Sequence, residues 1–277
     1  MKNKTKLMLG LSLLTAGTLA AGATGTFAWF TTNKTASATY SKIIAKSTTG
    51  SLGISMHGIT ESGLSDGSEA EDNEASLIGT TSFTTDVSSG DGVTFAQPKW
   101  KTNAGNDKPY YEVTNVSSKT GYFTQFYITL QNNGGAAVTV YLDTGTKVSA
   151  ATSGDSEDDA LASWTRVAVN NLDQGKSIVA SGTKIFGGTA MGNKYVAPTE
   201  SAGETLALQD LSATVLTTFS DISAGAVENQ KLFALEAGAH KNIGVSVWME
   251  GTASTDSQDS AKGGIVNVDL KFYAVEA

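Results

Sequence analysis

The chain has 277 residues, with 27 acidic and 19 basic side chains and a formal net charge of −8. The acidic balance argues against a nucleic-acid partner, because phosphate groups must be neutralised by Lys and Arg. The absence of cysteine excludes a disulfide framework and a cysteine nucleophile. Thirty glycines, abundant Ser and Thr, and a charged fraction of only 17% favour short strands joined by polar turns over helices.

The first 28 residues follow the pattern of a secretory signal peptide. Three lysines precede the apolar run 7–14, which thins into Ala, Gly and Thr before Ala28. A basic start, an apolar middle and a small residue at the cut are typical of such a peptide. We predict cleavage between Ala28 and Trp29, which gives a secreted mature chain of net charge −11. The alternative is an uncleaved anchor helix, but the run is interrupted and shorter than the ~20 apolar residues that span a bilayer.

The mature chain is expected to begin with an extended segment. Residues 29–46 show no helical periodicity and are rich in small and β-branched side chains, including Ile43 and Ile44. Residues 51–56 alternate apolar and small side chains, as a strand with one buried face does.

The stretch 57–115 is interpreted mainly as loops. It contains the acidic run 69–74, a predicted strand at 93–95 and a turn-rich segment at 103–108, with Pro109 as a boundary.

The clearest predicted strands flank a short turn. Residues 122–130 and 138–142 alternate apolar side chains, and the segment 132–135, Asn-Asn-Gly-Gly, tolerates the positive φ angles of turns. We expect two core strands that are connected directly.

The region 143–219 gives weaker signals. Residues 143–163 are polar and are interpreted as a loop, 164–169 as a strand, and 170–203 as glycine-rich turns. Residues 206–219 fit either a helix or two strands, and their Thr and Val content favours strands.

The C-terminal region again predicts two strands, at 243–249 and 266–272, each alternating apolar and polar residues. We therefore expect an all-β protein whose single domain, 47–277, is an antiparallel jelly-roll-like β-sandwich with long loop insertions at 57–115 and 143–240. It is preceded by the signal peptide 1–28 and the extended segment 29–46.

Catalytic motifs are absent from the sequence. The two histidines, His57 and His240, do not form a His-Glu-x-x-His pair, no Gly-x-Ser-x-Gly elbow occurs, and no glycine-rich loop cradles a phosphate. We expect a protein that is not an enzyme and requires no cofactor.

Two binding hypotheses stay open. The acidic clusters 69–74 and 155–159 supply carboxylates that can bind Ca²⁺, but neither matches a calcium-loop pattern, and solvated loops that maintain solubility are the favoured interpretation. Aromatic side chains could form a carbohydrate platform, although core or interface packing is the more common role. These aromatics are Trp29, Phe30, Trp100, Trp164 and Trp248.

Several motifs occur in a characteristic order. They are Gly-Thr-Phe-Ala-Trp-Phe-Thr at 25–31, Thr39-Tyr40, Gly-Ser-Leu-Gly-Ile at 50–54, the strand 126–134 ending in Asn-Asn-Gly, 245–252, and 263–272. In this order they resemble the TasA/camelysin family of exported bacterial proteins. The last two resemble the C-terminal hairpin of camelysin-like members. The resemblance covers about a third of the chain.

The resemblance implies a jelly-roll matrix protein that is exported by a signal peptidase of the SipW type. It also implies that the mature N-terminal segment can complete the sheet of the next subunit and build a fibre, with accessory matrix proteins as further partners. An extended strand can add to a sheet edge through main-chain hydrogen bonds, and head-to-tail addition gives a filament. The donor would lie within 29–46. Its candidate residues are Trp29, Phe30, Thr35, Ala36, Ala38, Tyr40, Ile43 and Ile44.

Three functions follow as hypotheses. The first is a secreted structural subunit that polymerises into biofilm or surface fibres by donor-strand exchange. The second is a monomeric cell-surface adhesin or binding module that keeps 29–46 in its own sheet. The third is a secreted camelysin-like protease, for which the sequence offers no recognisable site.

Overall fold

The computed structural model describes residues 36–47, 52–57, 74–75, 80–83, 86–102, 109–116, 121–172, 177–187, 194–195, 209–212, 216–251, 261 and 263–277. These residues are mostly in strands, so the all-β prediction is confirmed. The strands of the two main sheets are β1 (Ala36–Ser47), β2 (Leu52–His57), β3 (Glu74–Ala75), β4 (Thr80–Phe83), β7 (Phe123–Asn132), β8 (Val138–Leu142), β9 (Lys147–Ala150), β10 (Thr165–Leu172), β11 (Ile178–Gly187), β14 (Leu216–Thr218), β15 (Lys231–Leu235), β16 (His240–Met249) and β17 (Ile265–Glu276). Two small sheets contain β5 (Phe95–Thr102) with β6 (Pro109–Val116), and β12 (Lys194–Tyr195) with β13 (Gln209–Asp210). The helical elements are α2 (Ser156–Trp164) and the short 3₁₀ turns η2 (Phe219–Asp221) and η3 (Glu228–Gln230).

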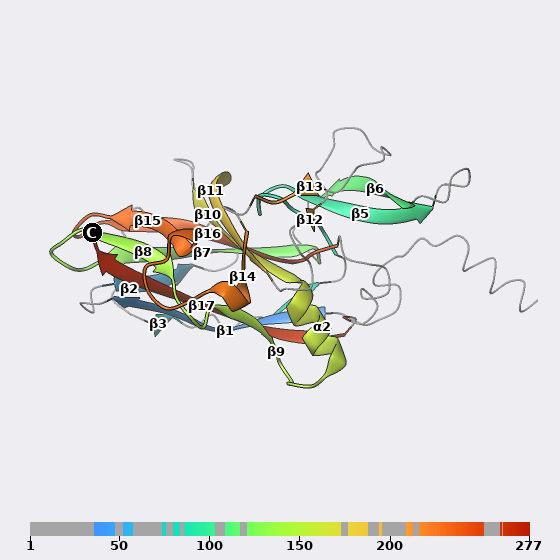
Figure 1. Ribbon diagram of the computed structural model, residues 1–277, viewed down its shortest axis with the longest axis horizontal. Helices are drawn as coiled ribbons and strands as arrows, with labels where there is room; N and C mark the ends of the chain where they lie inside the picture. The colour runs from blue at the N-terminus through green and yellow to red at the C-terminus, as the bar shows by residue number, and fades with distance from the viewer. Residues whose placement is uncertain are drawn as a thin grey trace, which may run out of the picture.

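Two sheets make up the body of the protein (Figure 1). The first has the order β15-β8-β17-β1-β3, with β4 also paired to β1 and β9 to β17. The second has the order β14-β11-β10-β16-β7-β2. Most neighbours are antiparallel, as predicted, but β1 runs parallel to β17 and β14 runs parallel to β11. The purely antiparallel expectation is therefore wrong at these two pairs.

One hydrophobic core lies between the two sheets. Alternate residues of β17, among them Val268 and Leu270, are fully buried and share one cluster with Phe126 and Ile128 of β7 and Val245 of β16. Their burial is the main favourable contribution to folding in a chain that lacks disulfides.

Strands that are neighbours in sequence often belong to different sheets. β7 and β8 are both present where they were predicted, but β7 pairs with β2 and β16 while β8 pairs with β15 and β17. The connection between them passes from one sheet to the other and is stabilised by Asn132, whose Nδ2 donates to the carbonyl of Ala136 (2.7 Å) and whose Oδ1 accepts from Gly134 N (3.0 Å). β16 and β17 are likewise in opposite sheets, so the predicted C-terminal hairpin is also wrong.

The segment 86–96 covers the outer face of the second sheet. Its Val87 and Phe95 join Phe123, Ile185 and Trp248 in a second hydrophobic cluster. Phe95 stacks on Phe123 with 3.8 Å between ring centroids and meets Trp248 edge-on. β5 begins at Phe95, so the strand predicted at 93–95 starts later than expected, and the β5–β6 hairpin extends away from the body (Figure 1).

The interpretation of 143–163 as a loop is wrong. This region contains β9 and α2, whose N-cap Asp155 accepts hydrogen bonds from the amides of Glu157 and Asp158. The helix buries Leu161 and Trp164, and few of its side chains are apolar, which explains why no helical stripe was visible in the sequence. Residues 170–203 were predicted to be turns, but Ile178–Gly187 form the strand β11. In the region 206–219 the described residues form β13, β14 and the start of η2.

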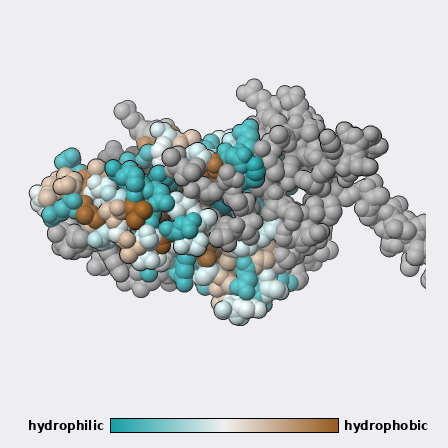
Figure 2. All heavy atoms as spheres, in the orientation of Figure 1, coloured by the Kyte–Doolittle hydropathy of each residue, from teal (hydrophilic) through white to brown (hydrophobic). Residues whose placement is uncertain are grey.

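The visible surface of the described part is largely polar. Figure 2 shows brown only in small separate spots on this face. Ile265 is the large hydrophobic side chain that stands out as exposed among the described residues, at 43%. A polar surface fits an acidic chain whose apolar side chains are held in the two clusters.

Candidate functional site

The N-terminal strand β1 occupies an interior place in the first sheet. On one side it pairs in parallel with β17, from Ser37 opposite Ile265 to Ser47 opposite Ala274. On the other side it pairs with β4 and β3. We call this place between β17 and β3–β4 the β1 position. A strand from the beginning of the chain thus completes a sheet whose neighbouring strand comes from the end of the chain.

Ser41 interrupts the ladder between β1 and β17. Tyr40 lies opposite Val268, and Lys42 lies opposite Asp269, so Ser41 is an extra residue that forms a bulge. Without the bulge, the register before it would place Lys42 opposite Leu270, which is fully buried. With the bulge, Ile43 lies opposite Leu270. The extra residue therefore keeps the lysines of β1 out of register with the core positions of β17.

On the edge of β1 that faces away from β17, the pairing partner changes at the same bulge. β4 pairs with residues 36–39, before the bulge, and β3 pairs with Ile43 and Ile44, after it. Among the described residues, β3 and β4 pair with no strand except β1. Removing β1 would therefore leave both of them without a sheet partner in the described part of the chain.

β17 has pairing partners other than β1. β8 and β9 pair with its other edge, and Val266, Val268, Leu270, Phe272 and Ala274 are fully buried. An incoming extended segment would meet a strand that β8 and β9 hold from its other edge, which favours strand addition.

A buried polar cluster lies at the end of β16. Nη1 of Arg166, on β10, is 2.9 Å from Oε2 of Glu250, and the same oxygen accepts from Trp248 Nε1 at 3.0 Å. Nη2 of Arg166 donates to the carbonyl of Lys194 at 2.8 Å. These bonds offset part of the cost of burying the two charges and connect β10, β16 and β12.

Asp86 is buried beside this cluster. Its neighbour Val87 forms a bridge with Glu250, with Val87 N bonded to Met249 O and Gly251 N bonded to Val87 O. Burial, with a smaller contribution from the charge of Glu250, raises the pKa of Asp86 from 3.8 to about 8. Asp86 is therefore protonated at neutral pH, which lowers the cost of burying two neighbouring carboxyl groups.

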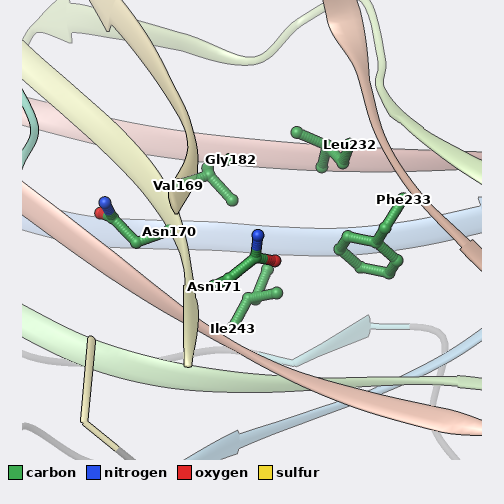
Figure 3. Close-up of a pocket in the computed structure, with 7 residues that line it drawn as sticks. All are labelled: Val169, Asn170, Asn171, Gly182, Leu232, Phe233 and Ile243. Carbon is green, nitrogen blue, oxygen red and sulfur yellow. The ribbon is translucent and has the colours of Figure 1, made fainter. Parts of the chain in front are cut away.

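A small cavity lies where β15 of the first sheet approaches β10, β11 and β16 of the second (Figure 3). It is lined by Val169, Asn170, Asn171, Gly182, Leu232, Phe233 and Ile243. Its volume of about 10 Å³ is close to the space of one water molecule and far below that of a site for an organic ligand. Phe233, one of the lining residues, has Lys241 Nζ 4.5 Å from its ring centroid, and partial burial lowers the pKa of Lys241.

The predicted donor residues divide into two groups. Ala36, Ala38, Tyr40, Ile43 and Ile44 are in β1. The remaining ones, Trp29, Phe30 and Thr35, lie outside the described residues, as do the signal peptide and the predicted cut between Ala28 and Trp29.

The other candidate residues are distributed over the fold. His240 is exposed at the start of β16, and His57 is in β2. Trp164 and Trp248 are buried, so they are not part of a carbohydrate platform. Trp100 is in β5. In the described ranges, no group of three or more His, Cys, Asp or Glu side chains is arranged to hold a metal ion.

The structure describes the two acidic clusters that were considered as Ca²⁺ sites to different extents. Residues 69–73 lie outside the described part, and Glu74 is in β3. In the second cluster, Asp155 caps α2, and Asp158 accepts from Thr152 N at 2.9 Å and from Ile265 N at 2.5 Å. These two carboxylates therefore hold backbone donors of α2, β17 and the loop before the helix.

Sequence reasoning missed the Ser41 bulge and the Arg166–Glu250 pair. The bulge has a sequence signal, because the apolar spacing changes phase between Tyr40 and Ile43. The ion pair has a weaker one: Arg166 is the single arginine of the chain and lies within an apolar strand pattern.

Among the described residues, no helix is long and apolar enough to cross a membrane. Comparison of the chain with family models and with curated proteins gave no match.

Proposed function

We propose that this protein is a secreted structural subunit, with a jelly-roll fold, that polymerises into extracellular fibres by exchange of its N-terminal strand. One observation carries the proposal: β1, the first described strand, fills an interior place in a sheet beside the last strand of the chain. The same segment of a second copy can make the same main-chain hydrogen bonds. Each subunit would then offer one donor and one acceptor, and such head-to-tail contacts propagate without closing.

Two further features support this reading. The motifs around the predicted cut place the donor at the new N-terminus after export, so the strand would be unavailable while the signal peptide is attached. A signal peptidase of the SipW type would make this cut. The acidic, cysteine-free composition suits a fibre whose stability comes from its core and its assembly, with biofilm matrix or cell surface as the location and accessory matrix proteins as additional partners. Neither catalysis nor a cofactor is required.

The experiment is electron microscopy of the purified chain beginning at Trp29, with and without Ca²⁺, alongside a variant that lacks residues 29–40. We expect filaments from the first protein and none from the second. The truncated variant retains an acceptor but no complete donor, so a small amount added to the full chain should shorten the filaments. This mixing result also shows that the variant is folded. Dispersed full-length monomers at high concentration would refute the proposal.

The second candidate function is a monomeric adhesin or binding module. In the single chain the β1 position is filled by the chain's own β1, which is the arrangement such a module would keep. Sedimentation analysis distinguishes the two, because a binding module stays monomeric at every concentration, whereas a fibre subunit shifts to large species as concentration rises.

A further inference from the structure

The connection between β1 and β2 limits how far β1 can move. β1 ends at Ser47 in the first sheet and β2 begins at Leu52 in the second, so only residues 48–51 join them. A chain of this length spans at most about 17 Å when fully extended. If the whole of β1 were transferred, its last residue would have to lie within that distance of the β2 of its own subunit.

That distance is short compared with the size of a subunit. A domain of roughly 250 residues has a radius of gyration of about 18 Å and hence a diameter of about 45 Å. Equivalent points on successive subunits of a head-to-tail fibre are separated by roughly one subunit width. Transfer of all of β1 would therefore require neighbouring subunits to overlap.

The bulge divides β1 into two parts with separate partners. Residues 36–40 pair with β17 and β4, and residues 42–47 pair with β17 and β3. The ladder to β17 is interrupted only at Ser41. Ser41 has no register partner in β17, so a division of β1 at this residue falls between two register pairs.

We propose that Ser41 is the point at which the donor strand divides, so that the transferred unit ends at Tyr40 and residues 41–51 become the linker between subunits. This inference rests on the proposed function. From Tyr40 to Leu52 an extended chain spans about 40 Å, which matches the width of a subunit. The incoming unit then restores the pairs with β4 and with the first half of β17, while β3 and the second half of β17 lose their pairs with β1 in the fibre.

The test uses cysteine pairs in the chain beginning at Trp29, which has no cysteine of its own. The first pair, Thr39→Cys with Asn267→Cys, joins register partners before the bulge. The second, Ile44→Cys with Lys271→Cys, joins register partners after it. Asn267 and Lys271 are both half-buried, so neither change alters a core position of β17. Adjacent strands lie about 4.8 Å apart, within reach of a short thiol cross-linker.

The control pair is Thr39→Cys with Lys271→Cys. These positions are four residues out of register, or about 13 Å along the strand, and should not be joined efficiently in any arrangement. Filaments are treated with the cross-linker and separated on denaturing gels. We expect the first pair to give a covalent ladder of oligomers, and the second pair to give neither a ladder nor an internally linked monomer.

The other outcomes identify which idea fails. Ladders from both pairs would show that the whole of β1 is transferred, which overturns the division at Ser41 and leaves strand exchange standing. Internally linked monomers from both pairs, in verified filaments, would show that β1 stays in its own subunit and would overturn strand exchange itself. Monomers linked only after the bulge would show that residues 42–47 remain in place and would also overturn the proposed linker.

Deletion of Ser41 provides a second measurement. It leaves every pair between β1 and β17 unchanged and makes the ladder continuous. We expect at least a tenfold slower polymerisation, because the first part of β1 can no longer separate at the bulge. An unchanged rate would overturn the role of Ser41.

Discussion

Arg166 and Glu250 form an ion pair inside the protein, with 2.9 Å between Nη1 and Oε2 and side-chain exposures of 1% and 0%. The pair lies between the second sheet and the segment that leads into the β5–β6 hairpin. Replacement of Arg166 by Leu leaves the Glu250 carboxylate buried without its counter-charge. We expect the free energy of unfolding to fall by about 3–5 kcal/mol, measured by urea denaturation.

The matched control is Lys194→Leu, which removes a charge from the pair Lys194–Asp210, whose side chains are 45% and 56% exposed. Exposed pairs contribute about 1 kcal/mol or less. Equal losses from the two variants would contradict a special role for the buried pair.

Asp86 gives the protein a specific pH dependence. The pKa of Asp86 in the folded chain, about 8, is above the ordinary value of 3.8. At a solution pH between these two pKa values, Asp86 holds a proton in the folded chain and has released it in the unfolded chain. The contribution of Asp86 to the free energy of unfolding is therefore largest below about pH 4, falls as pH rises, and levels off above about pH 8.

The variant Asp86→Asn should lose this part of the pH dependence while remaining folded. Urea denaturation at a series of pH values between about 5 and 9 measures it. Asp159→Asn, which makes the same change at an exposed position, is the control. A wild-type stability that does not fall relative to Asp86→Asn as pH rises would refute the assignment.

Asp158 holds two backbone amides that belong to different elements, those of Thr152 and Ile265. Asp158→Ala leaves both donors unsatisfied, and we expect a loss of about 1–3 kcal/mol in the free energy of unfolding. The control is Asp159→Ala, which removes a charge from the same helical turn at an exposed position. Its loss of helix-dipole stabilisation should be similar to that of Asp158→Ala. The difference between the two melting curves isolates the hydrogen bonds, and its absence would show that Asp158 does not hold β17.

Calcium removal is expected to leave the described fold unchanged. The carboxylates of Asp155 and Asp158 already accept backbone hydrogen bonds, so they are satisfied without a cation. Thermal unfolding in the presence of a chelator should match unfolding in added Ca²⁺. A clear rise in melting temperature with Ca²⁺ would restore the calcium hypothesis and direct attention to the acidic run 69–74.

Local sequence patterns predicted individual strands well. Alternation in 243–249 and 266–272 identified β16 and β17, because a strand with one face in the core repeats every two residues. The sequence also predicted that the N-terminal segment 29–46 is extended, and the described part of this segment lies in β1. Helix α2 was missed because it buries only a few side chains, Leu161 and Trp164 among them.

The sequence by itself determined the all-β class, the positions of the strongest strands and the absence of cysteine chemistry, because these depend on composition and on the spacing of neighbouring residues. Only the tertiary structure decided that β7 and β8 lie in opposite sheets, that β1 runs parallel to β17, and that Arg166 meets Glu250. These relationships join residues that are distant in sequence. Strand pairing and burial of charge depend on how the whole chain closes around its core, so no local pattern specifies them.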